Sequence, residues 1–275
     1  MSLFVRSILP LAGLTCVVCV ALPQTPLQTP QKNIEKPLIE GIATGKTRVI
    51  DLSYAINDKL VAWPGDAKAF EAKENASVEK NGYFTRSFWM LEHYGTHMDA
   101  PAHFPPGTTT VDKIPAEKFF GPAVVLDVRS EAERNPDYQL TVRRIEAWEQ
   151  KFGAIPAGAI VVLRTGWASR WPDVARYRNQ DANGTMHFPG FSVEAAKFLL
   201  QRKISGLGCD TLSIDPGNSP DFPVHHTVLG TGVYQLENLA DLKDLPESGA
   251  FLIAAPIKLE GGSGGPVRVF GLVAE

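Results

Sequence analysis

The sequence predicts one mixed α/β domain over most of the chain, and three observations support this prediction. Several short segments are apolar and rich in Val, Ile and Leu, which is typical of strands buried on both faces of a sheet. Segments with helical periodicity lie between them. The 275 residues are 44% hydrophobic and 21% charged, which is close to an ordinary globular protein with a sizeable core.

Eight segments are predicted to be strands, namely residues 49–52, 84–93, 123–128, 159–164, 204–210, 232–236, 250–256 and 267–273. Within residues 84–93 the pattern alternates, with Phe88 and Met90 opposite Trp89 and Leu91. Such alternation indicates a strand with two distinct faces.

Three helices are predicted between these strands. A helix over residues 142–152 has Thr141 as its N-cap, and a helix over residues 193–202 has Ser192. A third, shorter helix is expected over residues 225–229. No internal repeat or domain boundary interrupts this order of elements.

The N-terminus has the pattern of a secretory signal peptide. Arg6 precedes an apolar run over residues 8–22, and Ala21 fits a small-residue cleavage site. The run is shorter than the ~20 residues of a spanning helix, so we expect no stable membrane anchor. We therefore predict a signal peptide over residues 1–22 and a secreted or periplasmic protein. A transmembrane anchor is the competing interpretation.

Residues 23–47 contain four prolines and are predicted to be a flexible leader, which places the folded domain at residues 48–275. Two of the three cysteines precede this domain, so it has no internal disulfide. The remaining Cys209 lies in an apolar run and is expected to be buried. The net charge of −3, without a basic run, gives no support to nucleic-acid binding.

Residues 93–104 read HYGTHMDAPAHF, and they carry three histidines and one carboxylate: His93, His97, Asp99 and His103. Imidazoles and carboxylates are the ligands that zinc and manganese prefer. Gly95 and Pro101 argue against one regular element through the segment. We expect a strand ending near His93, then a tight turn and a short helical turn that bring the side chains onto one ion. A histidine-rich surface loop is the alternative.

This motif resembles the signature of the cyclase family of metal-dependent hydrolases, which includes bacterial kynurenine formamidases and isatin hydrolases. Every fixed position, His-x-Gly-Thr-His-x-Asp-x-Pro-x-His-Phe, is matched. The resemblance extends from about residue 49 to the C-terminus. It implies the swivelling β/β/α arrangement with a mixed sheet, metal-dependent hydrolysis, and a homo-oligomer, either a dimer or a tetramer.

The resemblance also implies a second group of metal ligands. In the formamidases a histidine and a glutamate lie twelve positions apart, as His225 and Glu237 do here; His226 is one residue off and is the alternative. Asp99 would then bridge two ions, with His93 and His97 on the first. One or two ions, and Zn²⁺ or Mn²⁺, remain open at this point.

His103 closes the motif and is expected to transfer a proton rather than bind metal, because an imidazole exchanges protons near neutral pH. Metal binding lowers the pKa of a bound water and supplies hydroxide at working pH. The predicted reaction is attack on an amide carbonyl, with His103 delivering a proton to the departing nitrogen.

The substrate pocket is predicted from aromatic residues. The resemblance places Trp63 beside the metals, and Phe104, Phe188 and Phe191 are candidates for apolar walls or for core positions. Asp210 and Asp215 are expected to organise hydrogen bonds around the site rather than to bind metal.

Residues 261–265 match the Gly-x-Ser-x-Gly pattern of serine hydrolases. The nucleophile of such enzymes requires a strand, a sharp turn and then a helix. Because Pro266 and an apolar run follow, we interpret this segment as a flexible glycine-rich turn before a strand.

The function predicted from these residues is a metal-dependent amidohydrolase that opens an aromatic cyclic amide such as isatin. The alternative is an arylformamidase that cleaves N-formylkynurenine. The signal peptide favours the former, and the His225/Glu237 pair favours the latter. Two other possibilities are a metal-dependent binding protein without turnover, which His103 argues against, and a structural metal site, which would more often use cysteines.

Overall fold

The computed structural model describes residues 35–66 and 68–275. The predicted signal peptide, residues 1–22, lies outside the described residues, as does the first part of the predicted leader. Within the described ranges, no helix is both long enough and apolar enough to cross a membrane. The fold is mixed α/β, which confirms the predicted class.

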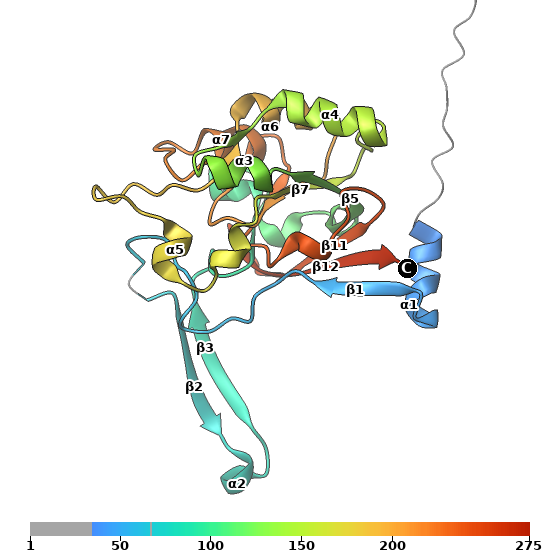
Figure 1. Ribbon diagram of the computed structural model, residues 1–275. Coiled ribbons are helices and arrows are strands. Elements are labelled where there is room, and N and C mark those ends of the chain that lie inside the picture. Colours follow the sequence, from blue (N-terminus) through green and yellow to red (C-terminus); the bar gives the residue numbers. More distant parts are fainter. Residues whose placement is uncertain (1–34, 67) are drawn as a thin grey trace, which may run out of the picture. The chain divides into compact units, whose positions relative to one another are not determined.

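One eight-stranded sheet organises the domain (Figure 1). Its order is β1-β12-β11-β5-β7-β9-β10-β4. The neighbours β5, β7, β9 and β10 are parallel, and the other pairs are antiparallel. The strands are β1 (Thr47–Asp51), β4 (His97–Asp99), β5 (Phe120–Asp127), β7 (Ile160–Arg164), β9 (Gly206–Cys209), β10 (Tyr234–Glu237), β11 (Phe251–Pro256) and β12 (Gly264–Ala274).

The long strand β12 closes this sheet on itself. Its first residues, Gly264, Gly265 and Pro266, pair with β4, and the following residues pair with β11 and β1. The short strand β4 therefore lies between β10 and β12. Apolar side chains from these strands form one core cluster, which includes Met98, Val125, Val162, Leu236 and Val269.

Helices cover the other face of the parallel strands (Figure 1). They are α3 (Arg129–Arg134), α4 (Val142–Phe152), α6 (Val193–Leu200) and α7 (Pro223–Leu229). The predicted N-caps are confirmed, because Thr141 accepts a hydrogen bond from the Arg144 backbone and Ser192 from the Ala195 backbone. Apolar residues of α4, α6 and α7 form a second core cluster with the strands.

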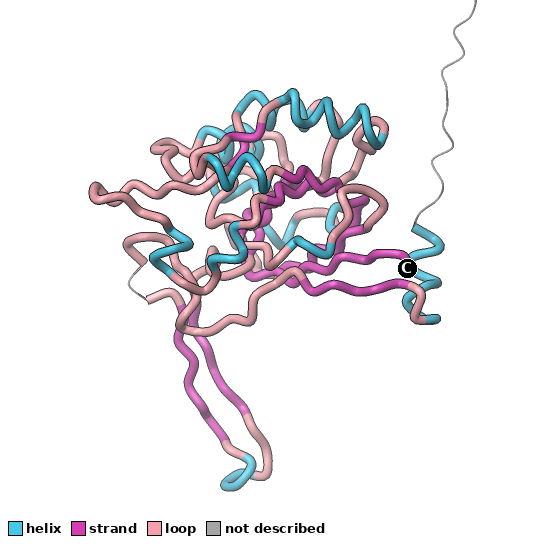
Figure 2. The backbone as a smooth tube through the Cα atoms, viewed as in Figure 1, coloured by secondary structure: helices cyan, strands magenta, loops and turns pink. Residues whose placement is uncertain are grey.

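Short elements fill the connections (Figure 2). Strands β6 (Gln139–Leu140) and β8 (Gly190–Phe191) pair with each other, and α5 spans Val174–Arg178. Single 3-10 turns occur at Pro101–His103, Val111–Lys113, Ala116–Phe119, Trp167–Arg170 and Leu242–Asp244.

The second half of the predicted leader is part of the folded domain. Residues Glu35–Thr44 form helix α1, which packs against β1 and β12. Leu38 is 1% exposed, and its carbonyl accepts a hydrogen bond from the Thr47 hydroxyl at 2.8 Å. The predicted boundary at residue 48 is therefore too late, because proline content alone does not show where a short helix finds an apolar surface.

A two-stranded arm extends away from the sheet (Figure 1, Figure 2). It consists of β2 (Phe70–Ala76), α2 (Val78–Asn81) and β3 (Thr85–Met90). The predicted strand 84–93 corresponds to β3, but both of its faces are open to solvent rather than one. Strand β2 was not predicted, because Phe70 is its only large apolar residue and Glu74 interrupts the alternation of apolar and polar residues.

Candidate metal centre and active site

Two neighbouring strands, β4 and β10, bring the first group of polar side chains together. His97 and Asp99 are two apart on β4, so they point to the same face. The antiparallel register with β10 places Glu237 directly opposite His97. The sequence predicted a tight turn and a short helical turn here, so strand β4 and its alignment of His97 with Asp99 were not expected. Glu237 follows His97 by 140 residues, so the motif alone does not show that they meet.

Four side chains from β4, β10 and α7 converge on a buried cluster. His97 Nε2 lies 3.2 Å from Asp99 Oδ1 and 3.5 Å from Glu237 Oε2. His225 Nε2 lies 3.4 Å from Asp99 Oδ2 and 3.2 Å from Glu237 Oε1. All four residues are at most 5% exposed. His226 contacts the ring of Phe104 instead, so the structure brings His225 and not His226 to the cluster.

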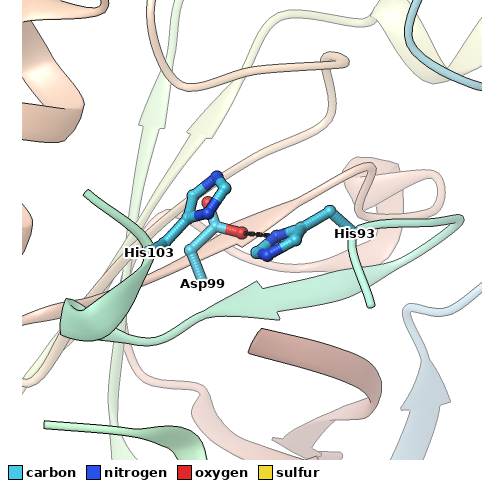
Figure 3. A group of neighbouring side chains, drawn as sticks. All are labelled: His93, Asp99 and His103. Carbon is cyan, nitrogen blue, oxygen red and sulfur yellow. Dashed lines mark hydrogen bonds and ion pairs between the residues drawn. The ribbon is translucent and has the colours of Figure 1, made fainter. Parts of the chain in front are cut away.

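His93 and His103 also lie close to the Asp99 carboxylate (Figure 3). His93 Nδ1 is 2.7 Å from Asp99 Oδ1, and the rings of His93 and His103 stack at 3.8 Å. Two groups of possible ligands therefore share Asp99: His93 and His103 complete one, and His97 and Glu237 the other. His93 Nδ1 and His97 Nε2 nevertheless face the same oxygen, Asp99 Oδ1, at 2.7 and 3.2 Å, and their binding to one ion stays a prediction.

Hydrogen bonds fix which ring nitrogen faces the cluster. His97 Nδ1 is 2.9 Å from the Gly95 carbonyl, and His225 Nδ1 is 2.6 Å from Asp215 Oδ2. Each histidine therefore carries its proton on Nδ1 and turns Nε2 inward, as metal-ligating histidines usually do. The predicted role of Asp215 in organising hydrogen bonds is consistent with this geometry.

His93 is oriented by two residues that sequence reasoning missed. Its Nε2 is 2.9 Å from Ser263 Oγ, and Ser263 donates from both Oγ (2.6 Å) and its backbone nitrogen (2.8 Å) to Glu92 Oε2. His93 Nε2 is thus the donor, and Nδ1 faces Asp99. Glycine is required beside it, because a Cβ at Gly264 would lie 2.6 Å from the His93 ring. The glycine-rich turn is therefore part of the site. Ser263 orients His93 there and is not a nucleophile on a strand–turn–helix elbow.

The donor set fits a divalent metal. Burial opposes the ionisation of Asp99, but the neighbouring histidines outweigh it and hold the pKa of this carboxyl well below its usual value. Burial also lowers the pKa of His97, yet Asp99 and Glu237 raise it to about 9. Asp99 Oδ2 is buried without a hydrogen-bond partner among the described residues. The cluster thus demands positive charge, which a divalent cation supplies in place of protons.

His103 has the opposite electrostatic environment. Burial lowers the pKa of His103 to about 4. Asp99 favours the protonated ring, but the nearby histidines oppose this effect. The ring is therefore neutral near pH 7 and able to accept a proton. It lies on the partly exposed side of the cluster, at the wall of a cavity.

A cavity of about 300 Å³ opens directly onto the cluster. Aromatic side chains form its apolar wall: Trp63 and Phe222 have ring centroids 5.6 Å apart, and Phe104 lies 5.7 Å from Phe222. The structure thus brings Trp63 and Phe104 to the predicted pocket. Phe188 does not line it, because this side chain is fully buried in a core cluster with Tyr177.

Phe222 is the wall residue that the sequence did not predict. Its φ of 47° lies in the left-handed region, which bulky side chains seldom adopt. It directly precedes Pro223, the first residue of α7, the helix that carries His225. Such strained backbone is concentrated at functional sites. The left-handed backbone of Phe222 thus places an aromatic wall residue directly before α7, the helix that carries the candidate metal ligand His225.

Asp210 supports the neighbouring loop. It follows β9 and accepts hydrogen bonds from Thr165 N at 2.9 Å, Thr165 Oγ1 at 2.7 Å and Gly166 N at 2.9 Å. Among the described residues, the Asp210 side chain forms no hydrogen bond with His97, Asp99, His225 or Glu237. This agrees with its predicted role as a residue that does not bind metal.

Comparison with known proteins gives this site a family. The model of the family described as putative cyclase matches residues 50–216. The chain is 35% identical to the isatin hydrolase of Roseibium aggregatum, over 84% of this chain and 94% of that protein. It is 32% identical to the kynurenine formamidase of Salinibacter ruber, over 80% of this chain and 95% of that protein.

A solved structure supports the same relationship. Isatin hydrolase A from Labrenzia aggregata, bound to benzyl benzoate, matches with a TM-score of 0.80 and 38% identity, over 87% of this chain and 99% of that chain. The chain belongs to the putative cyclase family. It is a metal-dependent hydrolase that acts on amide carbon–nitrogen bonds. The predicted family, fold and enzyme class are confirmed.

Proposed function

We propose that this enzyme opens an aromatic cyclic amide of the isatin type. The observation that carries the proposal is the aromatic wall of Trp63, Phe104 and Phe222 directly beside the Asp99 cluster. Aromatic rings favour stacked or edge contacts with other flat rings. A planar fused ring fits between these side chains with its carbonyl directed at the histidines and carboxylates.

The candidate ligands are His93, His97, Asp99, His225 and Glu237, and the cofactor is Zn²⁺ or Mn²⁺. When bound, such a metal polarises a carbonyl oxygen and lowers the pKa of water. Hydrogen bonds to Gly95, Asp215 and Ser263 hold the histidine rings in the orientation that presents one free nitrogen each. These contacts reduce the reorganisation needed on binding.

The reaction adds a water oxygen to the amide carbon, breaks the carbon–nitrogen bond and places a proton on the nitrogen. His103 is the residue that moves this proton. Its neutral ring accepts a proton from the attacking water and returns it to the departing aryl nitrogen. The aromatic wall excludes bulk water from the opposite side and keeps the scissile bond next to His103.

An arylformamidase activity is the second candidate, and the 32% identity to a kynurenine formamidase supports it. The two substrates share an aryl amide nitrogen, but differ in size and ring closure. The higher identity to an isatin hydrolase, 35%, favours the cyclic amide.

Turnover of isatin and of N-formylkynurenine by the metal-loaded enzyme, with metal content from elemental analysis, tests the proposal. We expect bound zinc or manganese and a higher kcat/KM for isatin. Faster cleavage of N-formylkynurenine would replace the first candidate with the second. Metal without hydrolysis of either compound would reject both substrates.

The protein is proposed to be secreted or periplasmic, on the basis of the signal-peptide pattern in residues 1–22. N-terminal sequencing of the protein recovered from a periplasmic extract tests this. A new N-terminus shortly after Ala21 is expected, whereas an intact Met1 in the cytosolic fraction would contradict it.

A further inference from the structure

Gln235 of β10 is a fully buried amide whose polar atoms are not hydrogen-bonded. Its side chain is 0% exposed, and neither Nε2 nor Oε1 has a partner among the described residues. An unpaired amide in the interior is costly, so its presence on a central strand requires an explanation.

The strand register determines where this amide lies. Gln235 pairs with Asp99 of β4, and Gly264 of β12 pairs with Asp99 from the other side. Partners in an antiparallel register point to the same face, with Cβ atoms about 5 Å apart. Glu237, two residues further along β10, reaches the cluster on this face. Since Gly264 has no side chain, Gln235 is the side chain that flanks Asp99 in this row of the sheet.

The other neighbours of the amide are apolar. On its second side Gln235 pairs with Leu207 of β9, which is fully buried. Helix α7 packs on β10, and its residue Val228 belongs to the same core cluster as Leu207. The strand register therefore offers the amide one polar side chain, which is the Asp99 carboxylate.

Asp99 has an unpaired atom that complements the amide. Four buried side-chain atoms of the described residues have no hydrogen-bond partner, and three of them are Asp99 Oδ2, Gln235 Nε2 and Gln235 Oε1. A donor and an acceptor thus lie on neighbouring strands without reaching each other directly. One buried water fits such a pair, because it accepts a hydrogen bond from the amide and donates one to the carboxylate.

Metal binding makes this donor more important. Three imidazoles approach the Asp99 carboxylate, namely those of His93, His97 and His225. An imidazole nitrogen that holds a metal cannot also donate a hydrogen bond to the carboxylate. The amide of Gln235 keeps its N–H groups, and carboxylates that bind metal are usually hydrogen-bonded by such a surrounding group.

We propose that Gln235 is a positioning residue for the metal centre. Through one buried water its amide donates to Asp99 Oδ2 and holds the carboxylate in the orientation that both ligand groups share. Gln235 is not among the residues that line the cavity, so it acts through Asp99 and not on the substrate. This inference rests on the ligand role that the proposed function gives to Asp99.

Calorimetric titration of the metal-free protein with Mn²⁺, and separately with Zn²⁺, tests the proposal with two matched variants. Gln235→Met keeps the length of the side chain but removes the amide. Its metal affinity should fall by about 10- to 100-fold. Leu236→Met is the control, because this buried neighbour on β10 belongs to the core cluster on the opposite face. The control should bind metal as the wild type does.

Thermal unfolding of the same metal-free proteins separates positioning from packing. Gln235→Met removes an unpaired buried amide, so its melting temperature should equal or exceed that of the wild type. Leu236→Met should melt slightly lower because its core contacts change. A lower melting temperature of Gln235→Met with unchanged metal affinity would show that the amide only supports the fold, and would overturn the proposal.

Wild-type metal affinity in Gln235→Met, or equal losses in both variants, would also overturn it. A crystal structure of the metal-loaded wild type gives a test that needs no variant. A water between Gln235 Nε2 and Asp99 Oδ2 is expected there, whereas Gln235 Oε1 bound to the metal would make this residue a ligand and contradict the proposal. A wild type that binds no metal would instead reject the proposed metal centre itself, so the two failures are distinguishable.

Discussion

Asp127 and Asp99 each lie at the end of a strand of the sheet, but the basic side chains around them are of different types. Asp127, at the end of β5, is held by Arg164 at 2.9 Å and Arg129 at 2.8 Å. Burial opposes its ionisation, but hydrogen bonds from these arginines lower the pKa of Asp127 to about 2. Asp99, at the end of β4, has only imidazoles around it.

The difference lies in whether the positive partner is permanent. Arginine stays protonated at any physiological pH, so the Asp127 pair is already complete and serves stability. Imidazoles lose their protons readily and then offer nitrogen lone pairs to a cation. The same acidic residue type is therefore structural in one region and a candidate metal ligand in the other.

Replacing Asp99 by Asn should produce the largest effect on function. The variant loses the carboxylate shared by both ligand groups, so metal content should fall and kcat/KM should decrease by at least about 10³-fold. Elemental analysis and turnover measure this. Asp127→Asn is the matched control and should keep its metal; equal metal loss in both variants would break the comparison.

His103→Gln should separate proton transfer from metal binding. Metal content should remain, and kcat should fall by about 10²- to 10⁴-fold because proton transfer is lost. His187→Gln, at a partly exposed histidine paired with Asp137, is the control and should leave turnover unchanged. Loss of metal from His103→Gln would instead identify this residue as a ligand.

Asp127→Asn should lower the free energy of unfolding by about 2 kcal/mol at neutral pH. The folded pKa lies below the unfolded value, so this stabilisation is complete above about pH 4 and disappears as pH falls toward 2. Urea unfolding at several pH values measures it. A constant difference between the wild type and the variant down to pH 2 would contradict the assignment.

The smallest effect is expected at the aromatic wall. Trp63→Leu should raise KM for isatin about 10-fold with little change in kcat. The variant loses the stacking interaction between the Trp63 ring and the substrate, which contributes about 1 kcal/mol to binding. Phe188→Leu is the control in the buried cluster and should lower thermal stability while leaving KM unchanged. The reverse pattern would place Phe188 nearer to the substrate than the structure does.

The sequence predicted elements whose signals are local. Strand β7 was expected within one residue, because Ile160 to Leu163 form a continuous apolar run. Helix α4 was expected with its observed bounds, because Thr141 caps its start. Strand β4 was missed because it has three residues between Gly95 and Pro101, and its ladder depends on β10 and β12, which are distant in sequence.

The same distinction holds for the site. His93, His97, Asp99 and His103 form one local motif, and family spacing supplied His225 and Glu237. Ser263 and Phe222 carry no signal of their own. Ser263 meets His93 across 170 positions of sequence, and only the approach of Gly264 to β4 makes that contact. Glu92 adjoins the motif and was the one missed residue with a visible cue.

The closure of the sheet by β12 sets the order in which the enzyme is completed. Thr47 pairs with Ala274, and Ser263 orients a ligand near residue 93. The last strand must therefore reach β4 before the site is whole, and such pairing between distant parts of the sequence gives a high contact order that slows folding. A nascent chain that still lacks its last strand cannot assemble the full cluster. Because His93 takes its orientation from Ser263 and the close approach of Gly264, we expect the ligand set to be complete only after the last strand has paired.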